Sequence, residues 1–175
     1  MSILKVARMG HPVLRRRAES IGRSDLKNRA LQQLIDDMID TMHEYQGVGL
    51  AAPQVHEGVR LFVAMLDEEP DANSVASVLI NPEIEPATRE QHAGWEGCLS
   101  IPDIRGLVPR YTEITLRGLD REGRPRELAL KGFPARVAQH ETDHLDGVLF
   151  FDRMTSFESL TFLDEYSRYW TKDED

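Results

Sequence analysis

The sequence HETDH at residues 140–144 is the feature that most restricts what this chain can fold into. Two histidines four residues apart lie on one face of a helix, with Cβ atoms about 5–6 Å apart. The two imidazoles can therefore bind one divalent cation, and Glu141 is placed to take a proton from water held by that cation. Pro134 suits a first helical turn and Gly147 favours a stop. The pattern predicts a metal-binding helix that begins near Pro134 and ends before Gly147.

The same five residues can also form an ordinary pair of surface histidines on a charged helix. Apolar residues follow directly, VLFF at 148–151, so we expect the helix to be half buried. A catalytic metal site needs a third protein ligand and an open position. Downstream Glu158 and Glu165 lie in an amphipathic segment, whereas upstream Cys98 lies between a glycine and an apolar residue, where a thiolate can project. The candidate metal ligands are Cys98, His140 and His144.

Helical and strand-like patterns are segregated along the chain, which favours an α+β fold with an antiparallel sheet. The length of 175 residues suits one domain, residues 1–175. Helices are predicted over Leu26–Tyr45, with Ser24 as the N-cap and Gly47 as the stop, over the HETDH segment, and over Ser156–Trp170. Strands are predicted over 60–66, 75–84, 111–119 and 126–131, with a turn at 120–123 and Pro82 ending a paired segment.

Charge and cysteine content exclude several classes of protein. The net charge of −9 argues against a general nucleic-acid binder. No apolar run approaches the roughly 18–20 residues that span a bilayer, and residues 1–17 lack the apolar core of a signal peptide. Cys98 is the single cysteine, so a reducing compartment is the simplest setting. We expect a protein that binds neither DNA nor membranes, with a frayed acidic end at 173–175.

A third segment of interest, GVGLAAPQ at 47–54, consists of small residues that follow a helix. It lacks the lysine of a P-loop and the spacing of a dinucleotide-binding turn. One interpretation is a tightly packed turn. The other is a loop whose backbone lines a substrate groove, with Gln54 donating its amide to a developing oxyanion. The residues alone leave both interpretations open.

Together, these segments resemble the peptide deformylase family, whose motifs are GxGLAAxQ, EGCLS and QHExDHLxG. Here the motifs read GVGLAAPQ at 47–54, EGCLS at 96–100 and QHETDHLDG at 139–147, in the same order and at similar separation. The resemblance implies removal of the formyl group from the N-terminal formylmethionine of nascent polypeptides, with release of formate. It also implies antiparallel sheets packed around a central HExxH helix, with an N-terminal helix and a C-terminal helix. The setting that it implies is the bacterial cytoplasm in preference to an organelle.

The resemblance also assigns roles to residues at the matching positions. One divalent metal ion is expected, Fe(II) in the cell, with Zn(II), Ni(II) or Co(II) able to take its place, bound by Cys98, His140 and His144. Glu141 is the acid/base, and Gln54 and the backbone N–H of Leu99 stabilise the tetrahedral oxyanion. Glu96 is structural and pairs with an arginine such as Arg110.

The methionine side chain of such a substrate requires an apolar pocket. The expected substrate contacts are Val48, Gly49, Leu50, Phe133 and Val137, and ordinary core packing is the alternative for the apolar ones. Arg136 lies one helical turn before His140 and is expected to border this pocket. Some bacterial members dock on the ribosome through a basic C-terminal helix. Here the C-terminal segment carries acidic residues, which argue against docking through a basic helix. We therefore expect at most a transient contact with the ribosome.

Two other classes of function also fit an HExxH sequence. A metalloendopeptidase would cleave internal peptide bonds and would take its third ligand from downstream of the motif. A binding protein with a structural metal site would close it with a fourth protein ligand. The candidates for that fourth ligand are His43, His56, His92 or a carboxylate.

Overall fold

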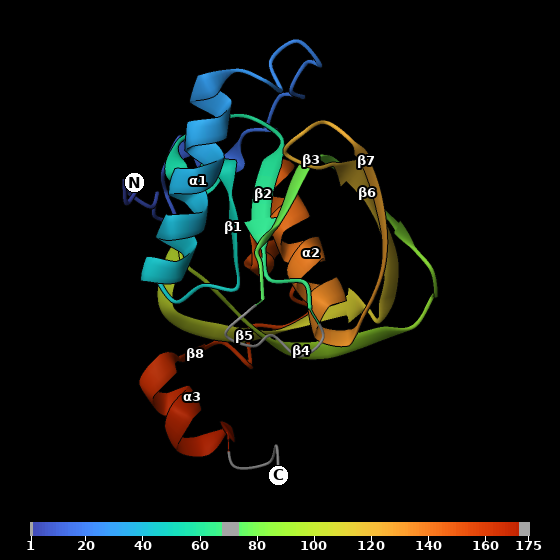
Figure 1. Cartoon of the computed structure of the whole chain (residues 1–175). Coiled ribbons are helices and arrows are strands. Elements are labelled where there is room, and N and C mark those ends of the chain that lie inside the picture. Colours follow the sequence, from blue (N-terminus) through green and yellow to red (C-terminus); the bar gives the residue numbers. More distant parts are fainter. Residues whose placement is uncertain (1, 68–73, 172–175) are drawn as a thin grey trace.

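The computed structural model describes residues 2–67 and 74–171, and it confirms the α+β class. Antiparallel sheets surround α2 (Gly132–Leu145), the helix that carries HETDH, as Figure 1 shows. The larger sheet has the order β1-β2-β3-β6-β7, formed by Gly49–Ala51, Leu61–Ala64, Ser77–Pro86, Glu113–Leu119 and Pro125–Lys131. The smaller sheet has the order β4-β5-β8, formed by Gln91–Cys98, Ile101–Tyr111 and Thr161–Phe162.

The remaining elements flank these sheets. The N-terminal helix α1 spans Arg29–Glu44 and the C-terminal helix α3 spans Leu163–Tyr169. Short 3-10 helices occupy Pro12–Arg15, Ala52–Val55 and Phe150–Arg153. Within the described part of the chain, each helix is too short or too polar to cross a bilayer. The acidic residues 68–69 and 173–175 lie outside the described residues.

The larger sheet is buried on both faces at β1 and β2, and β2 shows how. Successive side chains of a strand point to opposite faces. Phe62 and Ala64 join the core around α2, whereas Leu61 and Val63 join a second core beneath α1. All four residues are fully buried, so β2 reads as a continuous apolar run and not as an alternating one. This sandwich fixes α2 against the sheet and thereby fixes the motif that α2 carries.

Two predicted helices differ from the observed ones at their ends. The first helix begins at Arg29 and not near Leu26, because the side chain of Asn28, and not Ser24, caps it by accepting a hydrogen bond from Ala30 N–H at 2.9 Å. The third helix was predicted to be much longer than α3. Its expected first half instead forms a turn and the strand β8, which pairs with β5. Long-range strand pairing therefore overrides a helical periodicity there.

The strand predictions also need correction. Pro82 does not end a paired segment, because β3 continues to Pro86 after a register shift between Ile80 and Glu83. Asn81 sits in that irregularity with a left-handed φ of 51°. The segment 91–110 was not predicted as strand at all, yet with Tyr111 it forms the β4–β5 hairpin. The 47–54 segment, expected as a loop or turn, contributes the short strand β1 and a 3-10 turn.

Candidate metal centre and cavity

The three predicted ligands meet in the structure. The Sγ atom of Cys98 lies 3.2 Å from Nε2 of His144, which lies 3.2 Å from Nε2 of His140. Donors held about 2.0–2.3 Å from one tetrahedral ion lie roughly 3.3–3.6 Å apart, so the set fits a single cation. Within residues 2–67 and 74–171 this is the one metal-ligand group found, and it leaves out the alternative ligands His43, His56 and His92.

Different elements bring these ligands together. Both histidines come from α2, four residues apart, and lie edge to face with ring centroids 4.9 Å apart. Cys98 is the last residue of β4, directly after a register shift in the β4–β5 pairing. Such an irregularity re-aims the side chain that follows it. The hairpin thus directs the thiol toward the face of α2 that carries the imidazoles.

Glu96 holds His140 in the orientation that a metal ligand needs. Its Oε2 lies 2.9 Å from Nδ1 of His140, so Nδ1–H donates to the carboxylate and Nε2 is left for a cation. Arg110 donates to both Glu96 oxygens, at 2.9 and 3.0 Å, which confirms the predicted pair. Arg110 also donates to Asp143 at 2.5 Å. Burial raises the pKa of Glu96, but the hydrogen bonds from His140 and Arg110 outweigh it and lower that pKa to about 2.

The thiol of Cys98 and the imidazole of His140 shift each other's pKa in opposite directions. Burial opposes ionisation of Cys98, but the charge of His144 and the hydrogen bond with His140 outweigh it and hold the pKa of the thiol well below its usual value. Burial also disfavours the charged form of His140, yet Cys98 and Glu96 raise the pKa of this imidazole well above its usual value. Thiolates bind divalent cations, and a cation would take the place of a proton on Nε2 of His140 while Nδ1–H stays bonded to Glu96.

Glu141 lies beside the cluster with one oxygen uncommitted. Its Oε2 is buried and has no hydrogen-bond partner in the structure. Burial raises the pKa of this carboxyl to about 7, with the charges of His140 and His144 opposing the rise. Its other oxygen packs against β1, where a Cβ added at Gly49 would lie 2.3 Å from Oε1. Glycine at position 49 is therefore what allows this carboxylate to approach the strand.

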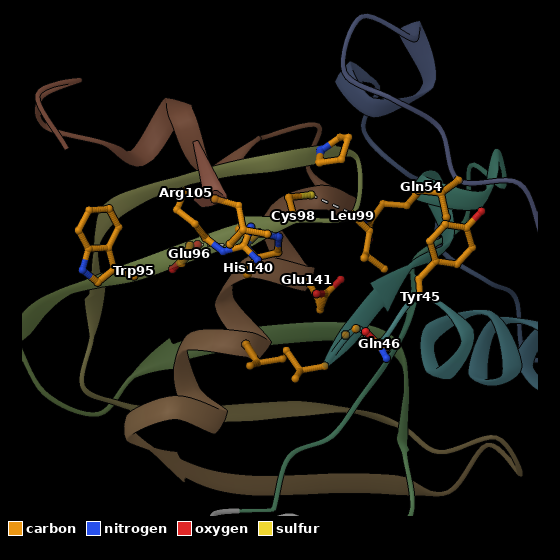
Figure 2. Close-up of a pocket in the computed structure, with 18 of the residues that line it drawn as sticks. Tyr45, Gln46, Gln54, Trp95, Glu96, Cys98, Leu99, Arg105, His140 and Glu141 are labelled. Atoms are coloured by element: carbon orange, nitrogen blue, oxygen red, sulfur yellow. Dashed lines mark hydrogen bonds and ion pairs between the residues drawn. The ribbon is translucent and has the colours of Figure 1, made fainter. Parts of the chain in front are cut away.

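A cavity of about 550 Å³ opens beside the cluster. Figure 2 shows Cys98, His140 and Glu141 in its middle, with Gln54 toward one end and Trp95 toward the other. Of the expected site residues, those that line the cavity are Val48, Gly49, Gln54, Cys98, Leu99, Phe133, Val137, His140 and Glu141. Two expected site residues are not part of the lining: the side chain of Leu50 is fully buried in the core beneath α1, and His144 is buried behind the other two ligands.

The amide of Gln54 is held in one orientation. Its Oε1 accepts a hydrogen bond from Ala51 N–H at 2.8 Å. Its Nε2 consequently faces the cluster, 3.2 Å from Oγ of Ser100 and 3.6 Å from Sγ of Cys98. The side chain is 2 % exposed, so its rotamer is fixed by packing as well as by hydrogen bonds. A fixed N–H donor beside the metal ligands matches the role expected from the sequence.

Arg136 borders the cavity, as expected, but its guanidinium is directed at β4. It donates to Glu96 at 2.8 Å and to the backbone carbonyls of Val108 and His92, each at 2.7 Å. The sequence analysis did not single out several other lining residues, of which Trp95 and Arg105 lie on the unrecognised strands β4 and β5. Those missed residues include Tyr45, Gln46, Trp95, Arg105 and Leu163. Trp95 directly precedes the EGCLS motif and Gln46 directly precedes the GVGLAAPQ motif, and this adjacency was a signal that could have found both residues.

Known proteins resemble this chain in sequence and in fold. The sequence profile of the polypeptide deformylase family matches residues 3–159. Peptide deformylase 2 of Nostoc sp. is 41% identical over 174 residues, which is 97% of this chain and 96% of the relative. A class I type b peptide deformylase from Acinetobacter baumannii superposes with a TM-score of 0.82 at 41% identity, covering 88% of this chain and 100% of that one. Another structure of the Acinetobacter baumannii enzyme, with Met-Ala-Ser bound, has a TM-score of 0.81 at 39% identity, covering 87% and 99%. With the Cys-His-His cluster beside Glu141, these similarities show that the chain belongs to the peptide deformylase family.

Proposed function

We propose that this chain, as one catalytic domain of residues 1–175, hydrolyses the formyl group from the N-terminal formylmethionine of nascent polypeptides. The observation that best supports this proposal is the position of Glu141, whose buried Oε2 has no hydrogen-bond partner. This carboxylate lies beside the Cys-His-His cluster and lines a cavity of about 550 Å³. The proposed metal ligands are Cys98, His140 and His144. A divalent ion bound there supplies Lewis acidity, which lowers the pKa of water toward neutrality.

Glu141 is proposed as the group that moves the proton. A carboxylate with a pKa of about 7 can accept a proton from water and return it to the leaving amine at neutral pH. Its uncommitted Oε2 is the atom proposed to carry that proton. Because the carboxylate is buried and packs against Gly49, it needs no rearrangement to do so.

Two donors are proposed for the negative oxygen that develops on the formyl group. The first is Nε2 of Gln54, already directed at the cluster. The second is the backbone N–H of Leu99, the residue that follows the cysteine ligand and also lines the cavity. Removal of one such donor typically lowers kcat by about 10²–10³-fold.

The peptide itself is proposed to bind as an added strand. β1 and β4 are both edge strands of their sheets, and both border the cavity through Gly49 and Gly97. An edge strand presents backbone N–H and C=O groups that an extended peptide can pair with. The methionine side chain is proposed to contact Val48, Phe133 and Val137, with backbone contacts at Gly49 and Leu50. Val48 and Phe133 are 44% and 53% exposed, as uncovered walls of an apolar pocket would be.

The native ion is proposed to be Fe(II), with Zn(II), Ni(II) or Co(II) as functional substitutes. Thiolate and imidazole donors suit all four, so the ligand set supports a divalent transition metal without selecting one. The proposed partners are N-formylmethionyl nascent peptides, with a transient contact to the ribosome that produces them. The proposed location is the bacterial cytoplasm, in keeping with relatives from bacteria such as Nostoc sp. and Bordetella pertussis.

The test combines anaerobic purification, metal quantification and an assay of formate release from formyl-Met-Ala-Ser. The wild type should hold one metal ion per chain and release formate. Glu141→Ala should keep its metal yet lose nearly all turnover, while the exposed control Glu57→Ala should match the wild type. Wild-type turnover in Glu141→Ala would refute the assigned role. Cleavage of internal bonds in an unformylated peptide would favour a metalloendopeptidase, and a bound metal without any turnover would favour a structural site.

A further inference from the structure

The net charge of −9 conceals a strong asymmetry along the chain. Residues 2–18 contain five of the 21 lysines and arginines and none of the 30 aspartates and glutamates. This segment therefore carries a charge of +5, and the rest of the chain carries −14. We call residues 2–18 the N-terminal arm. Such an asymmetry indicates a partner with many negative charges, which the arm attracts and the remaining surface repels.

The N-terminal arm is attached along the body of the protein and is not a loose tail. Figure 1 shows the start of the arm, in dark blue, on the side of the molecule that carries α1. Backbone N–H groups of the arm donate hydrogen bonds of 2.7–2.9 Å to the side chains of Asp37 and Thr41 and to the carbonyl groups of Gln54, Ser100 and Leu145. A backbone held in this way is already ordered before a partner binds, which lowers the entropic cost of binding.

The side chains of the arm divide into a buried apolar set and an exposed basic set. Ala7, Leu14 and Ala18 are at most 5% exposed and pack into the body of the protein. The basic side chains are all exposed, and they are Lys5, Arg8, Arg15, Arg16 and Arg17. The fold therefore directs the charge of the arm outward.

Nearby carboxylates neutralise only part of this charge. Arg15 pairs with Asp152, and Nε of Arg17 lies 3.7 Å from Oδ1 of Asp146. Both carboxylates are 41% exposed, and ion pairs so open to water contribute little stability, so a phosphate can replace either carboxylate. The other three basic side chains of the arm form no ion pair with any residue that the structure describes.

The composition of the arm favours phosphate as the group that it binds. Four of its five cations are arginines, and three of these are consecutive at 15–17. A guanidinium presents a planar fork of donors that binds two phosphate oxygens at once. The arm contains no Phe, Trp or Tyr, the residues that stack on single-stranded bases or anchor a protein in a membrane interface. These features fit the backbone of a paired, folded nucleic acid better than its bases or a bilayer.

We propose that the N-terminal arm binds the phosphate backbone of structured RNA. The choice of RNA among polyanions rests on the proposed function, because nascent polypeptides emerge from a ribosome, whose surface is rich in RNA. Val6 and Arg8 of the arm also line the cavity that holds the metal-ligand cluster. RNA bound along the arm therefore lies close to the entrance for the substrate. The acidic C-terminal segment, in contrast, repels phosphate.

The test measures binding of the metal-loaded protein to a fluorescein-labelled RNA duplex by fluorescence anisotropy, at about 50–200 mM salt. Each phosphate contact contributes about 0.7–0.9 to the slope of log K against log salt, so five contacts give a slope of about −3.5 to −4.5. The double variant Lys5→Gln/Arg16→Gln removes two contacts. Its slope should be shallower by about 1.4–1.8, and its binding at 50 mM salt should be weaker by at least about 10-fold. Neither residue lines the cavity, so formate release from formyl-Met-Ala-Ser should stay unchanged.

The matched control is Arg89→Gln/Arg126→Gln, which makes the same change in net charge at two exposed arginines outside the arm. This control should bind RNA as the wild type does. A wild type that does not bind the duplex, or equal losses in the two double variants, would overturn the inference. Tighter binding to phosphatidylglycerol vesicles than to RNA would also overturn it and would assign the arm to a membrane. Formate release on the same samples judges the proposed deformylase function separately, since an enzyme that releases formate without binding RNA keeps that function.

Discussion

Replacing Gly49 with alanine tests whether the approach of Glu141 to β1 controls the proposed chemistry. The added Cβ would lie 2.3 Å from Oε1, 2.7 Å from Cδ and 2.9 Å from Cγ of Glu141. Real Cβ contacts almost never fall below 3.0 Å, so the carboxylate must retreat by at least about 0.7 Å. A misplacement of about 1 Å can lower a rate 10²-fold. We expect kcat to fall about 10- to 100-fold, equivalent to about 1.4–2.7 kcal/mol.

The assay is formate release from formyl-Met-Ala-Ser, with metal content and thermal unfolding measured on the same samples. Metal content should stay unchanged, because the three atoms nearest to a Cβ at Gly49 all belong to Glu141 and none belongs to a metal ligand. Gly58→Ala is the matched control, since nothing lies within 4 Å of a Cβ at that position and its φ is not positive. It should retain wild-type kcat.

A double variant separates displacement of Glu141 from other effects. If alanine at position 49 acts only through Glu141, then Gly49→Ala combined with Glu141→Ala should be no slower than Glu141→Ala alone. Additive losses would mean that Gly49 acts by another route, such as pairing of β1 with the peptide. A Gly49→Ala variant with kcat within twofold of the wild type would refute the steric reasoning altogether.

Three further changes probe the ligands, the buried ion pairs and the pocket. Cys98→Ser should retain less metal after dialysis against a mild chelator, measured by elemental analysis. The pKa of Glu96 falls from 4.5 to about 2 on folding, so its stabilisation, about 3 kcal/mol, is complete above pH 4.5 and is lost as the pH falls toward 2. Urea unfolding at pH 6 and pH 3 should therefore show a smaller acid loss in Glu96→Gln than in the wild type. Val48→Phe should raise KM for formylmethionyl peptides without lowering the unfolding temperature, because Val48 is 44% exposed on the cavity.

Periodic patterns predicted the elements with strong local signals. The apolar stripe of α1 and the HETDH helix were placed correctly, because each buries one face regardless of what covers it. The third helix was predicted too long because the pairing of β8 with β5 depends on a partner more than fifty residues away. Local periodicity carries no information about such a partner. Propensity is a weak guide wherever tertiary pairing competes with it.

The β4–β5 hairpin was missed for a physical reason. Its sequence contains Gly94 and Gly97, which count against strand in a local reading. In the structure these glycines serve side chains from elsewhere, since Cβ atoms there would lie within 3.0 Å of the guanidinium groups of Arg136 and Arg105. The two glycines that admit these guanidinium groups therefore made β4, the strand that carries Cys98, look unlike a strand in the sequence.

The site was predictable to the extent that its chemistry lies in short motifs. The ligand set and Glu141 follow from the HETDH sequence, the lone cysteine and the family resemblance, and the structure brings them together. The burial of the Leu50 side chain could not be foreseen, because the two faces of a short strand cannot be told apart before its neighbours are known. Leu163 and Trp95 reach the cavity only through packing between distant segments.

The buried ion pairs around Glu96 orient a metal ligand, and their stabilising effect alone does not explain them. Removing two charges from water can cost more than their attraction returns, and apolar replacements are often neutral or stabilising. Here, however, both carboxylate oxygens are occupied: Arg136 and Arg110 donate to Oε1, while Arg110 and His140 approach Oε2. That arrangement fixes the plane of the carboxylate and keeps the Nδ1 proton on His140. An apolar side chain at position 96 would leave the buried Arg110 without this partner and the imidazole free to turn its Nε2 away from the cation. Loss of such an orienting partner typically lowers metal affinity by about 10- to 100-fold, so we expect Glu96 to contribute to metal binding in addition to the stability that its ionised form supplies.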